Sequence, residues 1–149
     1  MPRPEPDEYL HSCWFSITLD GPSLKEEMHF KEAQGLDILI DVTEYQMGGK
    51  NDGPVKLPGM TRYTNIVLKR GITKSKKFFE WITKAVNGKV ERCGGKIALL
   101  KRDGSPVMEW TFKKAFPCRY EGPSFDAETG GICLETLEIA HEGLTMAGG

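Results

Sequence analysis

Few of the residues that do chemistry in proteins stand at spacings that would let them act together. None of the four cysteines forms the C-x-x-C pair of a zinc or redox site, because they lie at positions 13, 93, 118 and 133. Cys13 and Cys133 fall in apolar runs, and we interpret both as small core residues. The histidines form no H-E-x-x-H or H-x-H pattern; they are His11, His29 and His141. We therefore predict scattered surface histidines and no metal site.

The acids that could serve general acid–base catalysis also lack partners in the sequence. Asp37 and Asp41 stand four residues apart, but no histidine or activated nucleophile accompanies them. His141 and Glu142 are adjacent, and neighbouring side chains of a strand point to opposite faces. The sequence also lacks the motifs G-x-x-x-x-G-K-[ST], G-x-G-x-x-G and G-x-S-x-G. We predict that the protein is not an enzyme and needs no cofactor.

Length and composition are those of one soluble domain. The 149 residues suit a single domain over 1–149, with a proline-rich and acidic flexible arm at 1–9. The net charge of −1 removes any expectation of nucleic acid or anionic membrane as a partner. The first twelve residues contain no apolar run typical of a signal peptide, and no segment is apolar enough to span a bilayer. We expect synthesis in the cytoplasm and no membrane insertion.

Most of the chain has the alternation of β-strands. Apolar residues alternate with polar ones in the segments 13–19, 36–46, 62–70, 97–101, 107–112 and 132–144. Asp103-Gly104 predicts a tight turn between two of these strands, and Met108, Trp110 and Phe112 should share a face. In the last segment the apolar phase shifts, which indicates a bulge or burial on both sides. An antiparallel β-sandwich or barrel is expected.

One segment has the periodicity of a helix. Residues 73–88 place Phe78, Trp81, Ile82 and Ala85 at i, i+3, i+4 and i+7, and Phe79 and Val86 widen this apolar stripe. Thr73 or Ser75 is the expected N-cap, and Asn87-Gly88 is a normal end. The polar side carries Lys74, Lys76, Lys77 and Lys84, a basic face that is either solvated or a partner surface. The fold class is therefore mainly β (α+β), with one flanking α-helix.

Two of the predicted strands raise a question about their second face. Along 36–46, Leu39 and Tyr45 share a face with acids, and along 62–70, Tyr63 and Val67 share one with polar residues. The loop between them, 47–58, holds four glycines and two prolines, although a two-residue turn can join antiparallel strands. A loop of this length is usually functional or disordered. One hypothesis is a soluble sandwich-type binding module that uses this loop.

Several stretches together resemble one family. They are "GLDILIDVTEYQMGGKN", "VKLPGMTRYTNIVLKRGIT", "FFEWI", the tryptophan at 110, "AFPCRYEGPSFDA" and "ETLEIAHEGL", in this order and at these distances. The chain resembles, over roughly residues 9 to 146, the tail-tube proteins of contractile phage tails and of phage-tail-like injection systems. The most specific parts are "KLPG", "NIVLKRGIT" and "LEIAHEGL" taken together.

The resemblance implies a structural subunit of an inner tube. Six copies would form a ring whose sheets join into a barrel, and rings would stack around a lumen that conducts cargo or DNA. The expected partners are other copies of the chain, a sheath protein, and baseplate, tube-initiator and terminator proteins. Such a particle would be assembled in a bacterial or archaeal cell. A tube-initiating baseplate protein of the same family is the alternative within the resemblance.

The resemblance also implies a role for each of three sets of residues. The lumen should be lined by Asp37, Asp41, Thr43, Asn65 and Lys69. The loop 47–58 should connect stacked rings, through Gly48, Gly49, Asn51, Pro54, Val55, Leu57 and Pro58. The helix should face the sheath with Lys74, Lys76, Lys77 and Lys84.

Overall fold

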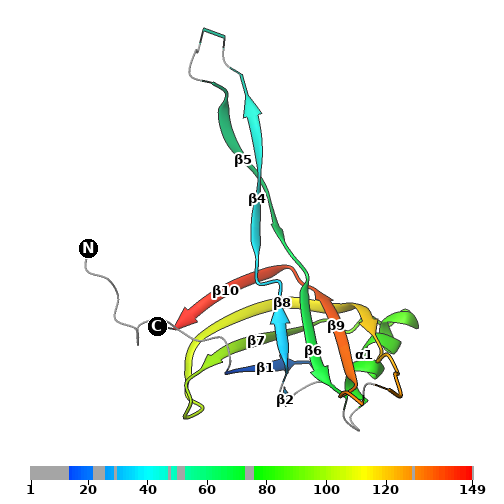
Figure 1. Ribbon diagram of the computed structural model, residues 1–149. Coiled ribbons are helices and arrows are strands. Elements are labelled where there is room, and N and C mark those ends of the chain that lie inside the picture. Colours follow the sequence, from blue (N-terminus) through cyan, green and yellow to red (C-terminus); the bar gives the residue numbers. More distant parts are fainter. Residues whose placement is uncertain are drawn as a thin grey trace.

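The protein consists of a curled β-sheet body, one helix and a long projecting hairpin (Figure 1). The computed structural model describes residues 14–21, 26–28, 30–46, 48–49, 53–72, 76–128 and 130–148. The helix α1 spans Lys77–Val86. The strands within these residues are β1 Phe15–Asp20, β2 Glu26–Met28, β3 Glu32–Gln34, β4 Ile38–Tyr45, β5 Val55–Tyr63, β6 Ile66–Gly71, β7 Cys93–Leu100, β8 Pro106–Glu121, β9 Leu134–Ala140 and β10 Gly143–Gly148.

The body is one antiparallel sheet that bends at β8. Its order is β2-β1-β7-β8-β9-β6-β3, and β10 also pairs with β8. Lys113 and Lys114 together oppose Gly94, which makes a β-bulge in which Lys114 has a φ of 53°. β8 pairs with β10 before the bulge, with β7 up to Ala115 just after it, and with β9 from Phe116 onward. The bend folds the sheet over itself, so the expected antiparallel sandwich or barrel with one flanking helix is confirmed.

The core lies between the two halves of this sheet and α1. One half contributes Ile17, Leu19, Ile97, Phe112 and Leu144, and the other contributes Ile66, Leu68, Leu137 and Ile139. The Phe112 ring packs closely against Gly95, where a Cβ atom would lie 2.5 Å from it. The predicted strand pair around Asp103-Gly104 is confirmed, and Gly104 N–H donates to the Lys101 carbonyl at 2.9 Å.

The helix α1 closes one end of the body. Phe78 and Trp81 are buried, and Trp81 Nε1 donates to the Glu91 carbonyl at 2.8 Å. The helix ends at Asn87 and Gly88, as predicted, and Gly88 has a φ of 84°. Phe79 and Val86 are exposed, so the prediction that they widen the buried stripe is wrong.

The helix also begins later than its sequence pattern suggests. Lys76 occupies the N-cap position and makes no side-chain capping bond. The expected caps, Thr73 and Ser75, lie outside the described residues, and so does the basic residue Lys74. Because Lys76 is the N-cap residue, neither of the two expected residues has that role.

The boundaries of the central strands differ from the prediction. The segment 62–70 is not one strand: β5 ends at Tyr63, and β6 begins at Ile66. The break occurs where the Thr64 hydroxyl donates to the Gly35 carbonyl at 2.9 Å. The loop 47–58 is also shorter than predicted, because its last residues, from Val55 onward, pair with β4 as part of β5.

The last predicted strand is two strands as well. β9 and β10 are separated by a corner at His141 and Glu142, because the two strands follow the bent edge of β8. Cys133 precedes β9 and is half-buried, while Cys93 is the cysteine that joins the core. Cys13, His11 and His29 lie outside the described residues, as does the expected N-terminal arm at 1–9.

Candidate assembly surface

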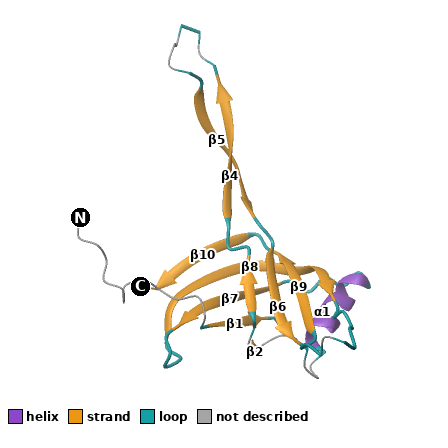
Figure 2. Ribbon diagram, in the orientation of Figure 1, coloured by secondary structure: helices purple, strands orange, loops and turns teal. Residues whose placement is uncertain are grey.

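The hairpin formed by β4 and β5 stands away from the body. Among the described strands, these two pair only with each other, and Figure 2 shows them as an isolated two-stranded ribbon. At its root, Thr64 N–H donates to the Asp37 carbonyl at 3.3 Å, and the Thr64 hydroxyl reaches the Asp37 carboxylate at 3.4 Å. An isolated hairpin is at best marginally stable in water, so this one needs other contacts.

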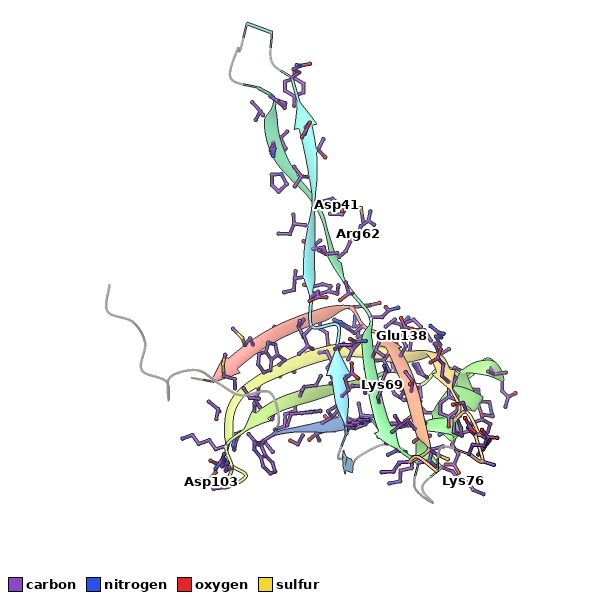
Figure 3. The ribbon with its side chains drawn as sticks, in the orientation of Figure 1. Asp41, Arg62, Lys69, Lys76, Asp103 and Glu138 are labelled. Carbon is purple, nitrogen blue, oxygen red and sulfur yellow. The ribbon has the colours of Figure 1, made fainter. Side chains whose placement is uncertain are left out.

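A β-bulge twists the hairpin near its middle. Ile40 pairs with Thr61 and Val42 with Pro58, so Gly59 and Met60 together oppose Asp41. A Cβ atom on Gly59 would lie 3.1 Å from the Asp41 carbonyl oxygen, which accounts for the Pro-Gly sequence at this point. Arg62 spans the bulge and binds the Asp41 carboxylate at 2.9 Å (Figure 3). Bulges increase the local twist, and the two strands cross here (Figure 1).

Both faces of the hairpin present apolar side chains to solvent. Ile38, Ile40 and Val42 share one face of β4, and each is more than half exposed. The opposite face carries Leu39, Tyr45 and Leu57, which are between 47 and 58% exposed. A two-sided apolar hairpin is unusual on a monomer, because contiguous exposed apolar surface marks an interaction site. The hairpin is therefore the strongest candidate for an assembly surface.

The five residues predicted to line the lumen lie in two places. Asp41 and Thr43 are on the hairpin, and Asp37 precedes its root. Asn65 and Lys69 are on the body, where Asn65 Nδ2 donates to the Glu138 carboxylate at 3.0 Å and Lys69 lies 3.8 Å from the Glu32 carboxylate.

The outer face of the body next to β6 is polar. Pairing across the strands aligns Glu32, Lys69, Thr136 and Glu121 in one row. The adjacent row contains Gln34, Val67, Glu138 and Arg119. Both rows turn away from the core, since Ile66, Leu68 and Leu137 point inward. The described face therefore carries both signs of charge. Tyr63 does not share it, because that ring packs against the core cluster.

The residues predicted to connect rings are distributed over a turn and a strand. Gly48 and Gly49 are exposed in the turn, and Pro54 directly precedes β5. Val55, Leu57 and Pro58 belong to β5, where they pair with Tyr45, Thr43 and Val42. Asn51 lies outside the described residues.

The basic residues of α1 differ in exposure and in their contacts, although the sequence suggests one continuous basic face. Lys76 is exposed and Lys77 is half-buried. Lys84 Nζ binds the Glu91 carboxylate at 3.1 Å. Phe79 and Val86 lie on the exposed side of the helix, and Phe79 meets the Tyr120 ring edge-on at 5.7 Å. The described exterior of α1 is thus mixed basic and apolar.

Sequence reasoning missed further exposed apolar residues at both ends of the body. Phe125 and Ile132 are each 84% exposed, and with Cys133 they line a depression of about 400 Å³ next to β9. Trp14 and Met146 are more than half exposed at the other end, where β10 is an edge strand. Phe125 follows "EGPS" in a loop-like stretch, so no periodic pattern marks it.

The body also contains a buried charged network below α1. Arg70 Nε donates to the Glu135 carboxylate at 2.5 Å, and the Tyr120 hydroxyl donates to its second oxygen at 2.7 Å. The Arg70 guanidinium lies 3.9 Å from the Phe78 ring centre, a cation–π contact. Burial, followed by the Glu135 carboxylate, raises the pKa of Tyr120 to about 12. This network fixes α1 against the sheet.

The described residues offer little reactive chemistry. No group of three or more metal-ligating side chains occurs among them. Burial, with Glu91 and Asp20 nearby, raises the pKa of Cys93 to about 11, so its thiol is a poor nucleophile at neutral pH. No helix within the described ranges is long and apolar enough to cross a membrane.

Comparison with known proteins points to one family. The family model of the T4-like virus tail tube protein gp19 matches residues 11–145. The fold superposes, with a TM-score of 0.86 and 28% identity, on a chain of the sheath–tube complex of the extracellular contractile injection system PVC in its extended state; the match covers 96% of this chain and 94% of that one.

Two other solved structures are also similar. One is a chain of the PVC sheath/tube terminator in the extended state, with a TM-score of 0.81, 30% identity and 98% of each chain covered. The other is Hcp1 from Flavobacterium johnsoniae, with a TM-score of 0.57, 25% identity, and 91% of this chain and 95% of that one covered. No curated protein sequence matches the chain.

Proposed function

We infer the function from the family to which the chain belongs, the T4-like virus tail tube proteins: it is a structural subunit of the inner tube of a contractile phage tail or phage-tail-like injection system. The resemblance identified from sequence is thereby confirmed. The soluble binding module is not favoured, since the family match spans nearly the whole chain.

The observation that carries the assembly mechanism is the two-sided apolar hairpin. Ile40 and Val42 on one face and Leu39 on the other are all at least 52% exposed. Burying apolar surface contributes roughly 25 cal/mol per Å². Covering these exposed side chains with another surface would therefore stabilise the subunit. Because the hairpin extends beyond the body, another copy of the chain is the surface that can cover it (Figure 1).

The unit of assembly in this proposal is a ring of six copies. Edge strands such as β10 present unpaired backbone groups, and closing a ring of sheets removes such edges. The apolar residues at the two ends of the body, Trp14 and Met146 at one and Phe125 and Ile132 at the other, are available for contacts between neighbours. Rings then stack through the hairpin and its turn, including Gly48, Gly49 and Pro54.

The proposed lumen surface combines the polar outer face of the body with the hairpin residues. It includes Asp37, Asp41, Thr43, Asn65 and Lys69. The ion pairs Asp41–Arg62 and Lys69–Glu32 balance charges locally. A wall of balanced charge holds neither acidic nor basic cargo strongly, which suits a conduit for DNA or protein.

The proposed exterior is the side of α1. Lys76, Lys77 and Lys84 would meet a sheath protein there, in a polar contact that salt weakens. We propose a sheath, a baseplate with its tube initiator, and a terminator as partners, because the similar solved chains come from a sheath–tube complex and from terminator structures. We further propose a purely structural role without catalysis, in a particle assembled in the cytoplasm.

The experiment that tests this function removes the outer half of the hairpin. Replacing residues 42–58 with an Asn-Gly turn should leave the folded body intact, since the core lies elsewhere. Electron microscopy of the purified wild-type protein should show tubes, and the shortened variant should give subunits or single rings. Circular dichroism provides the folding control. Tubes of normal length from the shortened variant would contradict the proposed stacking mechanism.

A further inference from the structure

The strand β10 is an open edge of the body. Among the described strands it pairs only with β8, so its second edge has no partner there. Natural proteins protect such edges with charged side chains, proline, bulges or very short strands. β10 has none of these protections: its six residues are "GLTMAG", and its pairing with β8 is regular from Gly143 to Gly148. The other two ends of the described sheet, β2 and β3, are three residues long and contain glutamates.

An apolar row of the core stops at this edge. Cross-strand pairing aligns Ile17, Ile97, Trp110 and Met146. The first two are at most 4% exposed, Trp110 is half-buried, and Met146 is 61% exposed. The exposed fraction rises toward the edge because no described strand lies beyond β10 to cover the last member of the row. One more strand with apolar side chains on this face would complete it.

The opposite face of the same edge is polar and basic. The row that ends at Thr145 contains two further threonines and Lys96, and it points away from the core. Lys113 lies over Gly143, where a Cβ atom would be 2.5 Å from the Cε atom of the lysine. The lysine side chain therefore crosses β10 from β8 and carries its ammonium group toward the open edge. A strand added at this edge should bring a carboxylate to this face.

The strand β4 has faces that match both sides of this edge. Aliphatic side chains form one face from Ile38 to Val42, while Leu39, Asp41 and Thr43 form the other. Side chains alternate along a strand, so one register satisfies both faces together. β4 placed beside β10 brings its aliphatic face to the incomplete apolar row. The same placement brings the carboxylate of Asp41 to the side on which the lysine crosses β10.

The hairpin offers β4, rather than β5, for such pairing. Both strands have an open outer edge, because among the described strands each pairs only with the other. β5 contains Pro58, which has no N–H to donate, and the bulge at Gly59 and Met60; both features disfavour strand addition. β4 contains neither a proline nor a bulged residue. The hairpin also points away from the β10 of its own chain (Figure 1).

We propose that β4 of one copy pairs along β10 of the next copy and extends that copy's sheet by main-chain hydrogen bonds. This pairing is the contact between neighbours in the proposed tube and rests on that function. Gly48 and Gly49 lie beyond the paired strand and stay available for ring stacking. The two strands are different surfaces of the chain, so the contact is head-to-tail and repeats from copy to copy. Such a contact forms a ring when the rotation closes, whereas pairing of two identical edges ends at a dimer.

Disulfide trapping between two co-expressed full-length variants with different tags tests the pairing. One variant carries Thr145→Cys, and the other carries a cysteine on the matching face of β4: Leu39→Cys, Thr43→Cys or Tyr45→Cys. The matched controls are Leu57→Cys and Val55→Cys, which replace the β5 partners of Thr43 and Tyr45. Strands lie about 4.8 Å apart, so β5 would be about 10 Å from β10, beyond the roughly 7 Å between Cα atoms that a disulfide can span.

The yield of the mixed disulfide dimer after mild oxidation decides between the two strands. At least one of the three β4 positions should give about tenfold more mixed dimer than either β5 control. Each variant expressed alone gives the background from the native cysteines. Equal yields from the β4 and β5 positions, or no mixed dimer above background from any β4 position, would overturn the pairing.

The side-chain part of the contact is tested by Met146→Lys. Lysine on an edge strand blocks strand addition, so the mixed disulfide yield should fall about tenfold. The subunit should still fold by circular dichroism, because Met146 is exposed. Val86→Lys is the matched control, since it places the same side chain at a 78% exposed apolar site on α1 and should leave the yield unchanged. An unchanged yield in Met146→Lys would contradict the pairing at β10.

Electron microscopy of the wild-type protein scores tube formation separately. Tubes without the β4–β10 disulfide would overturn the pairing and leave the tube function standing. The disulfide in a protein that forms no tubes would leave the pairing standing and overturn the tube function. Absence of both would contradict both.

Discussion

At the scale of single residues, two glycines with similar φ angles differ greatly in the space that they leave for a side chain. Gly35 has a φ of 98°, and a Cβ atom there would lie 2.0 Å from the carbonyl oxygen of Asn65. Gly104 has a φ of 89°, but a Cβ atom there would meet nothing within 4 Å. The difference between them isolates the steric cost of the close approach at the hairpin root.

Gly35→Ala should therefore destabilise the subunit much more than Gly104→Ala. The strain of a positive φ alone costs about 1 kcal/mol, and we expect that loss at Gly104. At Gly35 the clash with backbone adds to it, for a total of about 2–4 kcal/mol. Urea unfolding of the unassembled subunits measures both. Equal losses in the two variants would show that the chain at Asn65 can move aside.

The raised pKa of Tyr120 predicts that the free energy of unfolding falls at high pH. Its pKa is raised from 10.0 to about 12, by burial first and then by Glu135, so the folded state retains the phenolic proton longer than the unfolded state. This contribution is complete below pH 10 and is lost as pH rises toward 12. The unfolding free energy of the wild type should decline over this range more steeply than that of Tyr120→Phe. Parallel profiles for the two proteins would contradict the raised pKa.

The sequence could predict many residue-level features, but not those set by long-range contacts. Alternation correctly places Ile66 and Leu68 in the core, and helical spacing correctly buries Trp81. The sequence predicts a scattered surface residue at position 141, yet His141 is buried at a strand corner. Its partner Thr64 is 77 residues away in sequence, and no local pattern encodes that contact.

At the scale of elements, the existence of strands and helix was predictable and their boundaries were not. The sequence predicts one strand through Tyr63 and Ile66 because the alternation of side chains is not interrupted at Thr64 and Asn65. The chain leaves the hairpin and enters the body there, as the hydrogen bond from Thr64 to Gly35 shows. Similarly, the many glycines of the segment 47–58 predict a loop that includes Val55. Val55 instead pairs with Tyr45, because the hairpin is longer than the sequence indicates.

The hairpin should tolerate polar substitutions that the body does not. In Ile40→Thr with Val42→Thr, both positions are exposed, so subunit stability should change by no more than about 0.5 kcal/mol each. Tube formation should nevertheless be lost, because the proposed assembly buries these side chains. Leu68→Thr is the matched control, is 1% exposed, and should cost about 2–4 kcal/mol.

Electron microscopy and urea unfolding of the same samples separate the two effects. The interpretation requires stable hairpin variants that form no tubes. Abundant tubes from the double threonine variant would mean that the apolar face of β4 is not an assembly contact.

At the scale of the whole molecule, the arrangement separates folding from assembly. The core, the buried Arg70–Glu135 pair and α1 belong to the body, while the hairpin exposes its apolar residues outside it. In the proposed assembly, a subunit can therefore fold first and be completed by its neighbours later. The body has one polar sheet face near Lys69 and a helix-covered end near Lys76, and a tube must present different surfaces to its lumen and its exterior (Figure 3).

This asymmetry predicts which cysteine probes a tube will shield. Lys69→Cys on the polar face of β6 should react with a small maleimide that diffuses into assembled tubes, and should be protected from a large polymer-linked maleimide. Lys76→Cys at the start of α1 should react with both reagents. Both are built in a Cys118→Ala background, because native Cys118 is exposed and its Sγ lies 3.7 Å from Asn65 Nδ2, on the same face as Lys69.

The comparison is made on tubes and on unassembled subunits of each variant. In subunits both positions are accessible, so both reagents should label both variants; only assembly should distinguish them. The protection at position 69 follows from the size of the polymer relative to a closed bore and does not depend on thiol reactivity, which the small reagent reports independently. If the polymer-linked reagent labels position 69 in tubes as fully as position 76, the polar face of β6 lies outside the bore.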